Sequence, residues 1–169
     1  SMKVEYNRKL ATDYAMKYAL VPNQYYKFYQ FVNGIGGDCT NYVSQCLRAG
    51  GATMDYSSSR PWWYDRSGKA SICWAVANSL FWYLKTNQKL NRNVVKGFEV
   101  EDLSKLELGD LIFYENHNNS IFHAAIITSF IEEPTGKEPR ISQHSYNQIN
   151  ETYIKNYDYK KAHFLKITL

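Results

Sequence analysis

In the first half of the chain, apolar side chains recur every three or four positions, which is the period of one face of an α-helix. The predicted helices span residues 6–20, 39–49 and 71–86, and a further aromatic-rich helix or turn is expected over residues 24–32. In the first helix, Leu10, Tyr14 and Tyr18 are expected to form the buried stripe, with Ala11 and Ala15 beside them. The N-terminal half is therefore predicted to be helical.

The second half changes to runs of β-branched and aromatic residues, which favour strands. The predicted strands span residues 94–100, 111–114, 121–131, 140–145 and 163–169. Pro134-Thr135-Gly136-Lys137 is a turn signature between two of them. Helices followed by strands predict a single α+β domain over residues 1–169, with the N-terminal helices packed on an antiparallel sheet.

Composition excludes several classes of function. The net charge is +4 and the basic side chains are scattered, so we expect no nucleic-acid partner, whereas an anionic partner such as a bacterial wall is favoured. No run approaches the roughly 18 apolar residues that a membrane span needs. The three cysteines form no CxxC pair, and the chain has no nucleotide-binding loop or HExxH motif, so we expect no disulfide framework, metal or cofactor.

Cys39 follows a glycine-rich loop, residues 33–37, and opens a predicted helix. The free N–H groups of a helix N-terminus favour negative charge, so this position predicts a nucleophilic thiol with a lowered pKa. The backbone N–H of Cys39 is also a candidate donor to an oxyanion. The alternative is a buried structural cysteine, which is our interpretation of Cys46 and Cys73 on apolar helix faces.

His123 lies in the apolar strand segment Phe122-His123-Ala124-Ala125 and is the candidate base, although a hydrogen-bonded core histidine would read the same way. A second polar side chain on a neighbouring strand would hold its imidazole, and His144 and Gln143 are the candidates. Adjacent strand residues point to opposite faces, so only one of them can do so. His117 is expected to be solvated in a polar loop, and His163 has no obvious partner.

The segment from Gly36 to Leu47, Gly-Gly-Asp-Cys-Thr-Asn-Tyr-Val-Ser-Gln-Cys-Leu, followed by Ala49-Gly50-Gly51, resembles the signature of the bacterial "putative amidase domain" family. That family is related to the NlpC-type and CHAP cell-wall hydrolases. Leu108-Gly109-Asp110 is similar to their turn into a strand, and residues 122–126 and 141–145 stand where the relatives carry the catalytic His and the third polar residue. The resemblance covers nearly the whole chain and implies a papain-like fold with a Cys–His–His site made by Cys39, His123 and His144.

This resemblance implies a cysteine hydrolase of amide bonds, either a peptidoglycan amidase or an endopeptidase. In such an enzyme His123 would take the proton of Cys39, or the two would rest as an ion pair. Two alternatives stay open. One is a peptidase or deamidase acting on proteins or small amides, and the other is a non-catalytic wall-binding module on the same fold.

Substrate contacts are expected from loops and aromatic side chains. The candidates are Asn33, Asp38, Trp62, Trp63 and Trp74. For Trp62 and Trp63 the alternative is a lid that packs on the core, and for Asn33 and Asp38 it is loop structure. We expect a monomer that acts on peptidoglycan or a peptide and is secreted or associated with the cell wall. Ser1-Met2 is typical of a cloning remnant, so a leader is expected to have been removed.

Overall fold

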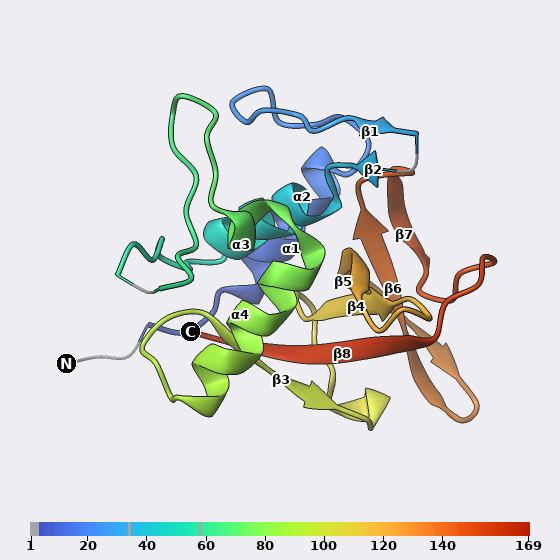
Figure 1. Cartoon of the computed structure of the whole chain (residues 1–169). Helices are drawn as coiled ribbons and strands as arrows, with labels where there is room; N and C mark the ends of the chain where they lie inside the picture. The colour runs from blue at the N-terminus through green and yellow to red at the C-terminus, as the bar shows by residue number, and fades with distance from the viewer. Residues whose placement is uncertain (1–3, 34, 58) are drawn as a thin grey trace.

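A six-stranded sheet forms the centre of the structure, a computed structural model that describes residues 4–33, 35–57 and 59–169 (Figure 1). In spatial order its strands are β3 (Lys96–Val100), β8 (Lys161–Thr168), β4 (Leu111–Glu115), β5 (Ile121–Glu133), β6 (Gly136–Gln143) and β7 (Gln148–Thr152). All neighbouring strands run antiparallel. The predicted α+β class with an antiparallel sheet is therefore confirmed.

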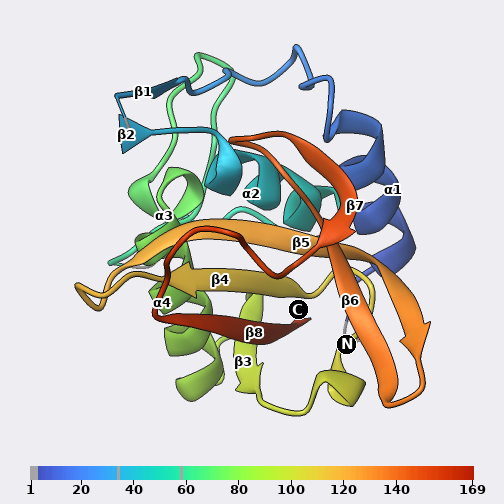
Figure 2. The same ribbon diagram turned by 90° about the vertical axis from the view of Figure 1, so that its right-hand side faces the viewer.

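Helices cover one face of this sheet, as the two views in Figures 1 and 2 show. They are α1 (Arg8–Tyr18), α2 (Cys39–Ala49), the short α3 (Ile72–Ala75) and α4 (Ala77–Lys89). Because successive strand residues point to opposite faces, Leu111 and Phe113 of β4 pack in the core beneath the helices. Ile112 and Tyr114 pack in a smaller core on the other face, where the 3₁₀ turn η1 (Leu103–Lys105) lies. Across the residues that the structure describes, no helix is long and apolar enough to span a membrane.

The buried face of α1 differs from the predicted stripe. Ala11 and Ala15 are fully buried, whereas Leu10 is 53% exposed and Tyr14 is only partly buried. The small side chains let α1 approach α2 closely, and the Tyr42 hydroxyl of α2 donates to the Ala15 carbonyl at 2.5 Å. The alanines face α2 because the two helices lie close together, and the periodic pattern of apolar residues carries no information on the distance between helices.

The helix predicted over residues 71–86 is interrupted. Val76 adopts an extended conformation, with φ −120° and ψ 125°, and separates α3 from α4. Ser44 of α2 donates to the carbonyl of Trp74 at 2.8 Å, so a tertiary contact satisfies a backbone group at this break. The apolar spacing continues across the break, which explains why the sequence predicts one helix.

Three short strands were not predicted. Within residues 24–32 the chain forms turns and then β1 (Phe31–Val32), which pairs with β2 (Ile35–Gly36) just before α2. The third, β7, is a polar edge strand with the sequence QINET, so it lacks the apolar alternation that marks a half-buried strand. These strands matter because β2 leads into Cys39 and the segment after β7 returns toward it.

Candidate active site

Cys39 is the first residue of α2 and is 8% exposed. The loop that leads to it passes close to Ser145, whose Oγ accepts a hydrogen bond from the Asp38 N–H at 2.9 Å. A Cβ on Gly37 would lie 2.5 Å from that Oγ, and Gly37 has a φ of +105°. Glycine is therefore required here on two counts, closeness of approach and backbone conformation. The expected position of Cys39 at a helix N-terminus is confirmed.

Asp38 holds the Cys39 loop in place. Its Oδ1 accepts hydrogen bonds from the Tyr29 N–H and the Asn41 side chain, both at 2.9 Å. Its Oδ2 lies 2.5 Å from Nδ1 of His144. The side chain is buried, and a carboxylate accepts hydrogen bonds but cannot donate one to an oxyanion. These contacts favour the alternative of loop structure for Asp38, and its role in substrate contact stays a prediction.

His144 belongs to the same structural cluster. Its Nε2 lies 2.6 Å from the Tyr18 carbonyl, and its ring stacks on Tyr42 with the centroids 4.1 Å apart. The two ring nitrogens thus lie against the Tyr18 carbonyl and the Asp38 carboxyl group. A buried, hydrogen-bonded His144–Asp38 pair joins the end of α1 to the Cys39 loop. The expected contact of His144 with His123 is not formed, because His144 lies in the turn after β6 and its ring is held by Asp38, Tyr18 and Tyr42.

Gln143 contacts His123 instead. The His123 Nε2 lies 2.8 Å from Gln143 Oε1, and the Gln143 Nε2 donates to the carbonyls of Ser145 at 3.3 Å and Tyr146 at 2.9 Å. These two donations fix the amide, so its oxygen must face the imidazole. His123 therefore carries its proton on Nε2, and Nδ1 keeps the lone pair that a general base needs. Of the two neighbours that the sequence offered, Gln143, the last residue of β6, is the one that contacts His123, whereas His144 belongs to the turn that follows.

Cys39 lies beside the backbone of the same strand. The N–H of Ala124, the residue after His123, hydrogen bonds to the Cys39 thiol, and the Thr40 hydroxyl lies 3.5 Å from the sulfur. Burial nevertheless raises the pKa of Cys39, because desolvation outweighs these hydrogen bonds. The lowered pKa that we expected from the helix N-terminus alone is thus wrong.

His123 is 7% exposed, and burial lowers its pKa to about 4 even though the hydrogen bond to Gln143 opposes this shift. The imidazole of His123 is therefore neutral at pH 7. With the raised pKa of the Cys39 thiol, this favours neutral forms of both groups over an ion pair, while a Cys39–His123 pair stays a prediction.

Two residues that sequence reasoning missed come from the segment after β7. The Tyr157 hydroxyl lies close enough to Cys39 for their charges to interact, and burial raises the pKa of Tyr157 to about 12, so it stays a hydroxyl donor. Lys155 donates to Gln143 Oε1 at 2.5 Å. No periodic pattern marks this segment, and only the fold of the chain back against β5 and β6 brings it to the site.

The tryptophans are divided between core and surface. Trp62 and Trp74 are fully buried with their rings 4.8 Å apart, and their indole N–H groups donate to Ser44 and Asn41. Their burial favours packing in the core over contact with a substrate for Trp62 and Trp74. Trp63 is half-buried and stacks on the exposed Tyr56, with 6.3 Å between centroids.

Asn33 is the remaining candidate for substrate contact. It is exposed in the turn between β1 and β2 and has a φ of +52°. Asparagine adopts positive φ more readily than most residues, so the turn itself accounts for Asn33 as well as a contact with substrate would.

The other histidines have partners away from this site. His163, for which the sequence suggested none, lies between Glu99 at 3.1 Å and Glu115 at 2.7 Å. His117 is exposed and lies 3.0 Å from Asp158. Within the described residues, no group of three His, Cys, Asp or Glu side chains could hold a metal ion.

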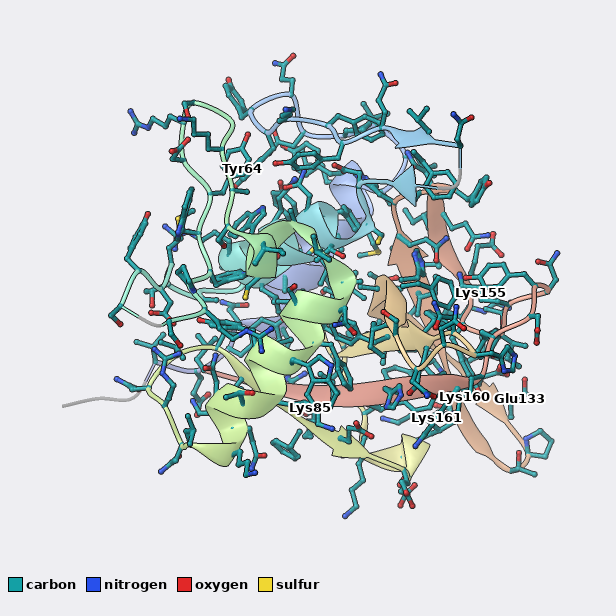
Figure 3. The ribbon with its side chains drawn as sticks, in the orientation of Figure 1. Tyr64, Lys85, Glu133, Lys155, Lys160 and Lys161 are labelled. Atoms are coloured by element: carbon teal, nitrogen blue, oxygen red, sulfur yellow. The ribbon has the colours of Figure 1, made fainter. Side chains whose placement is uncertain are left out.

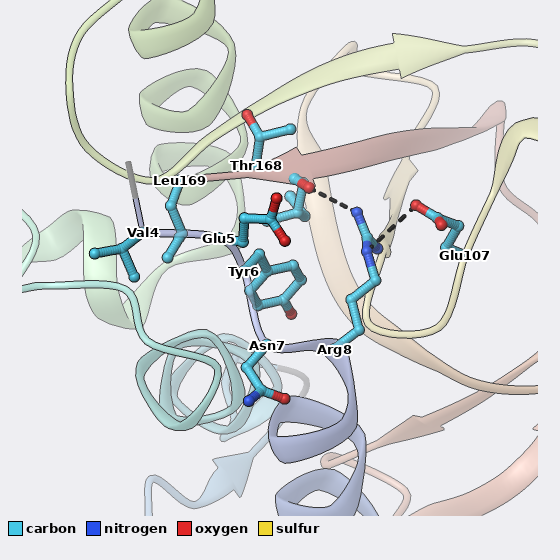
Figure 4. Close-up of a pocket in the computed structure, with 9 residues that line it drawn as sticks. Val4, Glu5, Tyr6, Asn7, Arg8, Glu107, Thr168 and Leu169 are labelled. Carbon is cyan, nitrogen blue, oxygen red and sulfur yellow. Dashed lines mark hydrogen bonds and ion pairs between the residues drawn. The ribbon is translucent and has the colours of Figure 1, made fainter. Parts of the chain in front are cut away.

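A hollow of about 700 Å³ lies between the N-terminal segment and the end of β8 (Figure 4). Arg8, the basic residue that lines it, already contacts Asp110 at 2.7 Å, Glu107 at 3.3 Å and the Ile167 carbonyl at 2.8 Å. The Asn7 N–H donates to the Gly50 carbonyl, so this hollow lies at the C-terminal end of α2, opposite Cys39. The hollow is thus separate from the site.

Residues 5–167 match the family described as "Putative amidase domain". The chain is similar to two proteins of Bacillus subtilis (strain 168). It is 32% identical to "Uncharacterized protein YhbB" over 145 residues, covering 85% of this chain and 42% of that protein. It is 33% identical to "Uncharacterized protein YjcM" over 154 residues, covering 86% of this chain and 32% of that protein. The chain thus spans less than half the length of these relatives.

No solved structure matches the chain. The papain-like fold that the resemblance implies therefore stays a prediction, as does the relation to the NlpC-type and CHAP hydrolases.

Proposed function

The chain belongs to the "Putative amidase domain" family, and from this premise we propose that it is a cysteine hydrolase that cleaves amide bonds of peptidoglycan. The family description supports amide hydrolysis at a general level. The cysteine mechanism rests on one observation, the fixed tautomer of His123. Gln143 holds the proton on Nε2, which leaves Nδ1 as a base in a site that also contains the Cys39 thiol.

In the proposed reaction, Nδ1 of His123 takes the proton of Cys39 as the sulfur attacks the carbonyl carbon. The oxyanion accepts hydrogen bonds from the Cys39 N–H and the Tyr157 hydroxyl. The C–N bond then breaks, and His123 returns its proton to the leaving amine. Water attacks the resulting thioester, with His123 as the base, and releases the carboxylic acid and the free thiol.

Peptidoglycan is proposed as the substrate on chemical grounds. The net charge of +4 favours an anionic polymer, and the cysteine segment resembles the signature of the putative amidase domain family, for which a relation to cell-wall hydrolases is expected. Phe122 and Tyr157, 40% and 41% exposed, pack edge to face near the thiol and offer apolar surface to a sugar or peptide. Action outside the cell, on the wall, is part of the same proposal.

Purified sacculi incubated with the protein test this function. We expect soluble fragments with new free amines, identified by mass spectrometry, and none from protein treated with iodoacetamide. A new amine at the first residue of the stem indicates cleavage at the muramoyl–peptide bond, whereas an amine within the stem indicates an endopeptidase. Intact sacculi combined with cleavage of simple peptide amides would reject peptidoglycan as the substrate and favour a peptidase.

Replacing Gln143 by Ala is expected to lower kcat on the order of 10²-fold with little change in KM, because His123 loses the partner that fixes its tautomer. Gln148→Ala is the matched control. This amide lies 3.5 Å from Lys155 but makes no hydrogen bond to His123 within the described residues. Equal losses in the two variants would contradict a specific role of Gln143.

The pH dependence of alkylation and of hydrolysis follows from the shifted pKa values of Cys39 and His123. The pKa of Cys39 is raised, so its thiolate is scarcer at pH 7 than that of a free cysteine, and its alkylation by iodoacetamide should keep rising beyond pH 9. Hydrolysis needs neutral His123, so kcat/KM should fall as the pH drops through about 4. Site-resolved mass spectrometry measures the alkylation of Cys39, and initial rates of hydrolysis measure kcat/KM. A plateau of alkylation between pH 5 and 7 would instead reveal an ion pair.

A further inference from the structure

Lys155 is a half-buried cation at the edge of the candidate site. It lies in the segment between β7 and β8, apart from the labelled Lys160 and Lys161 (Figure 3). Its Nζ donates to Gln143 Oε1 at 2.5 Å and lies 3.5 Å from Gln148 Oε1 and 5.4 Å from the centre of the Tyr114 ring. Every one of these neighbours is neutral.

The charge surroundings of Lys155 differ from those of Lys160, which is also labelled in Figure 3. Among the described residues, no Asp or Glu oxygen lies within ion-pair distance of Lys155, whereas the nearby Lys160 lies 3.4 Å from Glu115. Burial therefore lowers the pKa of Lys155 to about 8, with no neighbouring charge to offset it. An ammonium group that is partly desolvated and has no counter-ion costs stability, and such arrangements concentrate at functional sites.

The position of Lys155 connects it to the reacting groups. It shares Gln143 Oε1 with His123, and its charge acts on that imidazole. Two residues further along, Tyr157 lies near the Cys39 sulfur. A single short segment thus presents a cation and a hydroxyl on the same side of the site.

We propose that Lys155 is the binding site for a carboxylate of the substrate, so that the protein selects amides that carry a free carboxylate next to the bond that is cleaved. The inference rests on the proposed function, and it narrows the substrate to an acidic peptide or an acidic wall stem. The carboxylate of the substrate would be the counter-ion of the Lys155 ammonium group. The positive charge of Lys155 would then be used in binding, while Cys39 and His123 carry out the reaction.

A test without substrate compares two alkylating reagents of similar size at Cys39. Iodoacetate carries a carboxylate and iodoacetamide does not, so the ratio of their rates reports the local preference for an anion and cancels the reactivity of the thiol itself. We expect this ratio to fall on the order of tenfold in Lys155→Met and to be kept in Lys155→Arg. The control is Lys161→Met, which removes an exposed lysine nearby and should leave the ratio unchanged.

An unchanged ratio in Lys155→Met would overturn the carboxylate site, and so would an equal drop in Lys161→Met, which would show that only net charge matters. Failure of both reagents to reach Cys39 at any pH would overturn it as well, since the site must be open to a ligand. None of these outcomes depends on sacculi being cleaved, so they are distinct from failure of the proposed function.

A second measurement uses peptidoglycan whose carboxylates have been converted to amides with carbodiimide and ammonia. The unmodified protein should release fragments from it more slowly than from untreated sacculi, and Lys155→Met should treat the two substrates alike. Faster or equal cleavage of the amidated substrate by the unmodified protein would overturn the proposed selectivity while leaving the hydrolase itself established.

Discussion

Replacing Cys39 by Ala should reduce amide hydrolysis by roughly 10⁴- to 10⁶-fold, the loss typical of removing a nucleophile. The sulfur is the only protein atom that bonds to the substrate in the proposed reaction, in which His123 only transfers protons. The expected change in stability is small, since the side chain is short and lies at the start of α2. Rates on sacculi and thermal unfolding of the same preparation measure the two quantities.

Cys46→Ala and Cys73→Ala are the matched controls for this prediction. Both thiols are free and fully buried in the core, Cys46 in α2 and Cys73 in α3. Each variant should keep its hydrolytic rate and lose some stability, because a buried side chain is shortened. Full activity of Cys39→Ala would reject cysteine catalysis, and loss of activity in all three variants would point to damage to the fold.

His144→Ala should lower the free energy of unfolding by about 3–5 kcal/mol, the order of magnitude for breaking a buried carboxyl–imidazole pair from one side. The substitution leaves the Asp38 carboxylate buried with one oxygen unpaired, removes the donor to the Tyr18 carbonyl and opens a space beside the Tyr42 ring. Urea unfolding followed by tryptophan fluorescence measures the change. His117→Ala, which removes an exposed contact with Asp158, should change stability by less than about 1 kcal/mol.

This second prediction separates a structural His144 from a catalytic one. If His144 were the third member of the catalytic site, the alanine variant would keep its stability and lose activity. The structure leads us to expect the opposite, a large loss of stability and a smaller loss of activity. The activity should fall only because the Cys39 loop is held less firmly. Asp38→Asn should reproduce much of the stability loss, since the same pair is broken from the other side.

Local signals in the sequence determined several parts of this protein. The helix over residues 39–49 was predicted with its observed bounds, because a glycine-rich loop marks its start and Gly50-Gly51 its end. The long apolar strand β5 and its hairpin to β6 followed from β-branched residues and a proline–glycine turn. Cys39 and His123 stood out as candidates because each combines a reactive side chain with a distinctive local setting. Such features depend on neighbours in the chain, which a sequence contains.

Only the tertiary structure decided which side chains meet. Gln143 and His144 are adjacent, and the choice between them depends on where β6 ends, since Gln143 is its last residue and contacts His123, whereas His144 lies in the turn that follows. The sign of the Cys39 pKa shift likewise depends on burial beneath other segments, which outweighs the helix N-terminus. Lys155 reaches the site because the chain after β7 folds back over it. The end of a strand, the burial of a side chain and the path of the chain after β7 are all set by partners distant in sequence, so no local pattern could specify them.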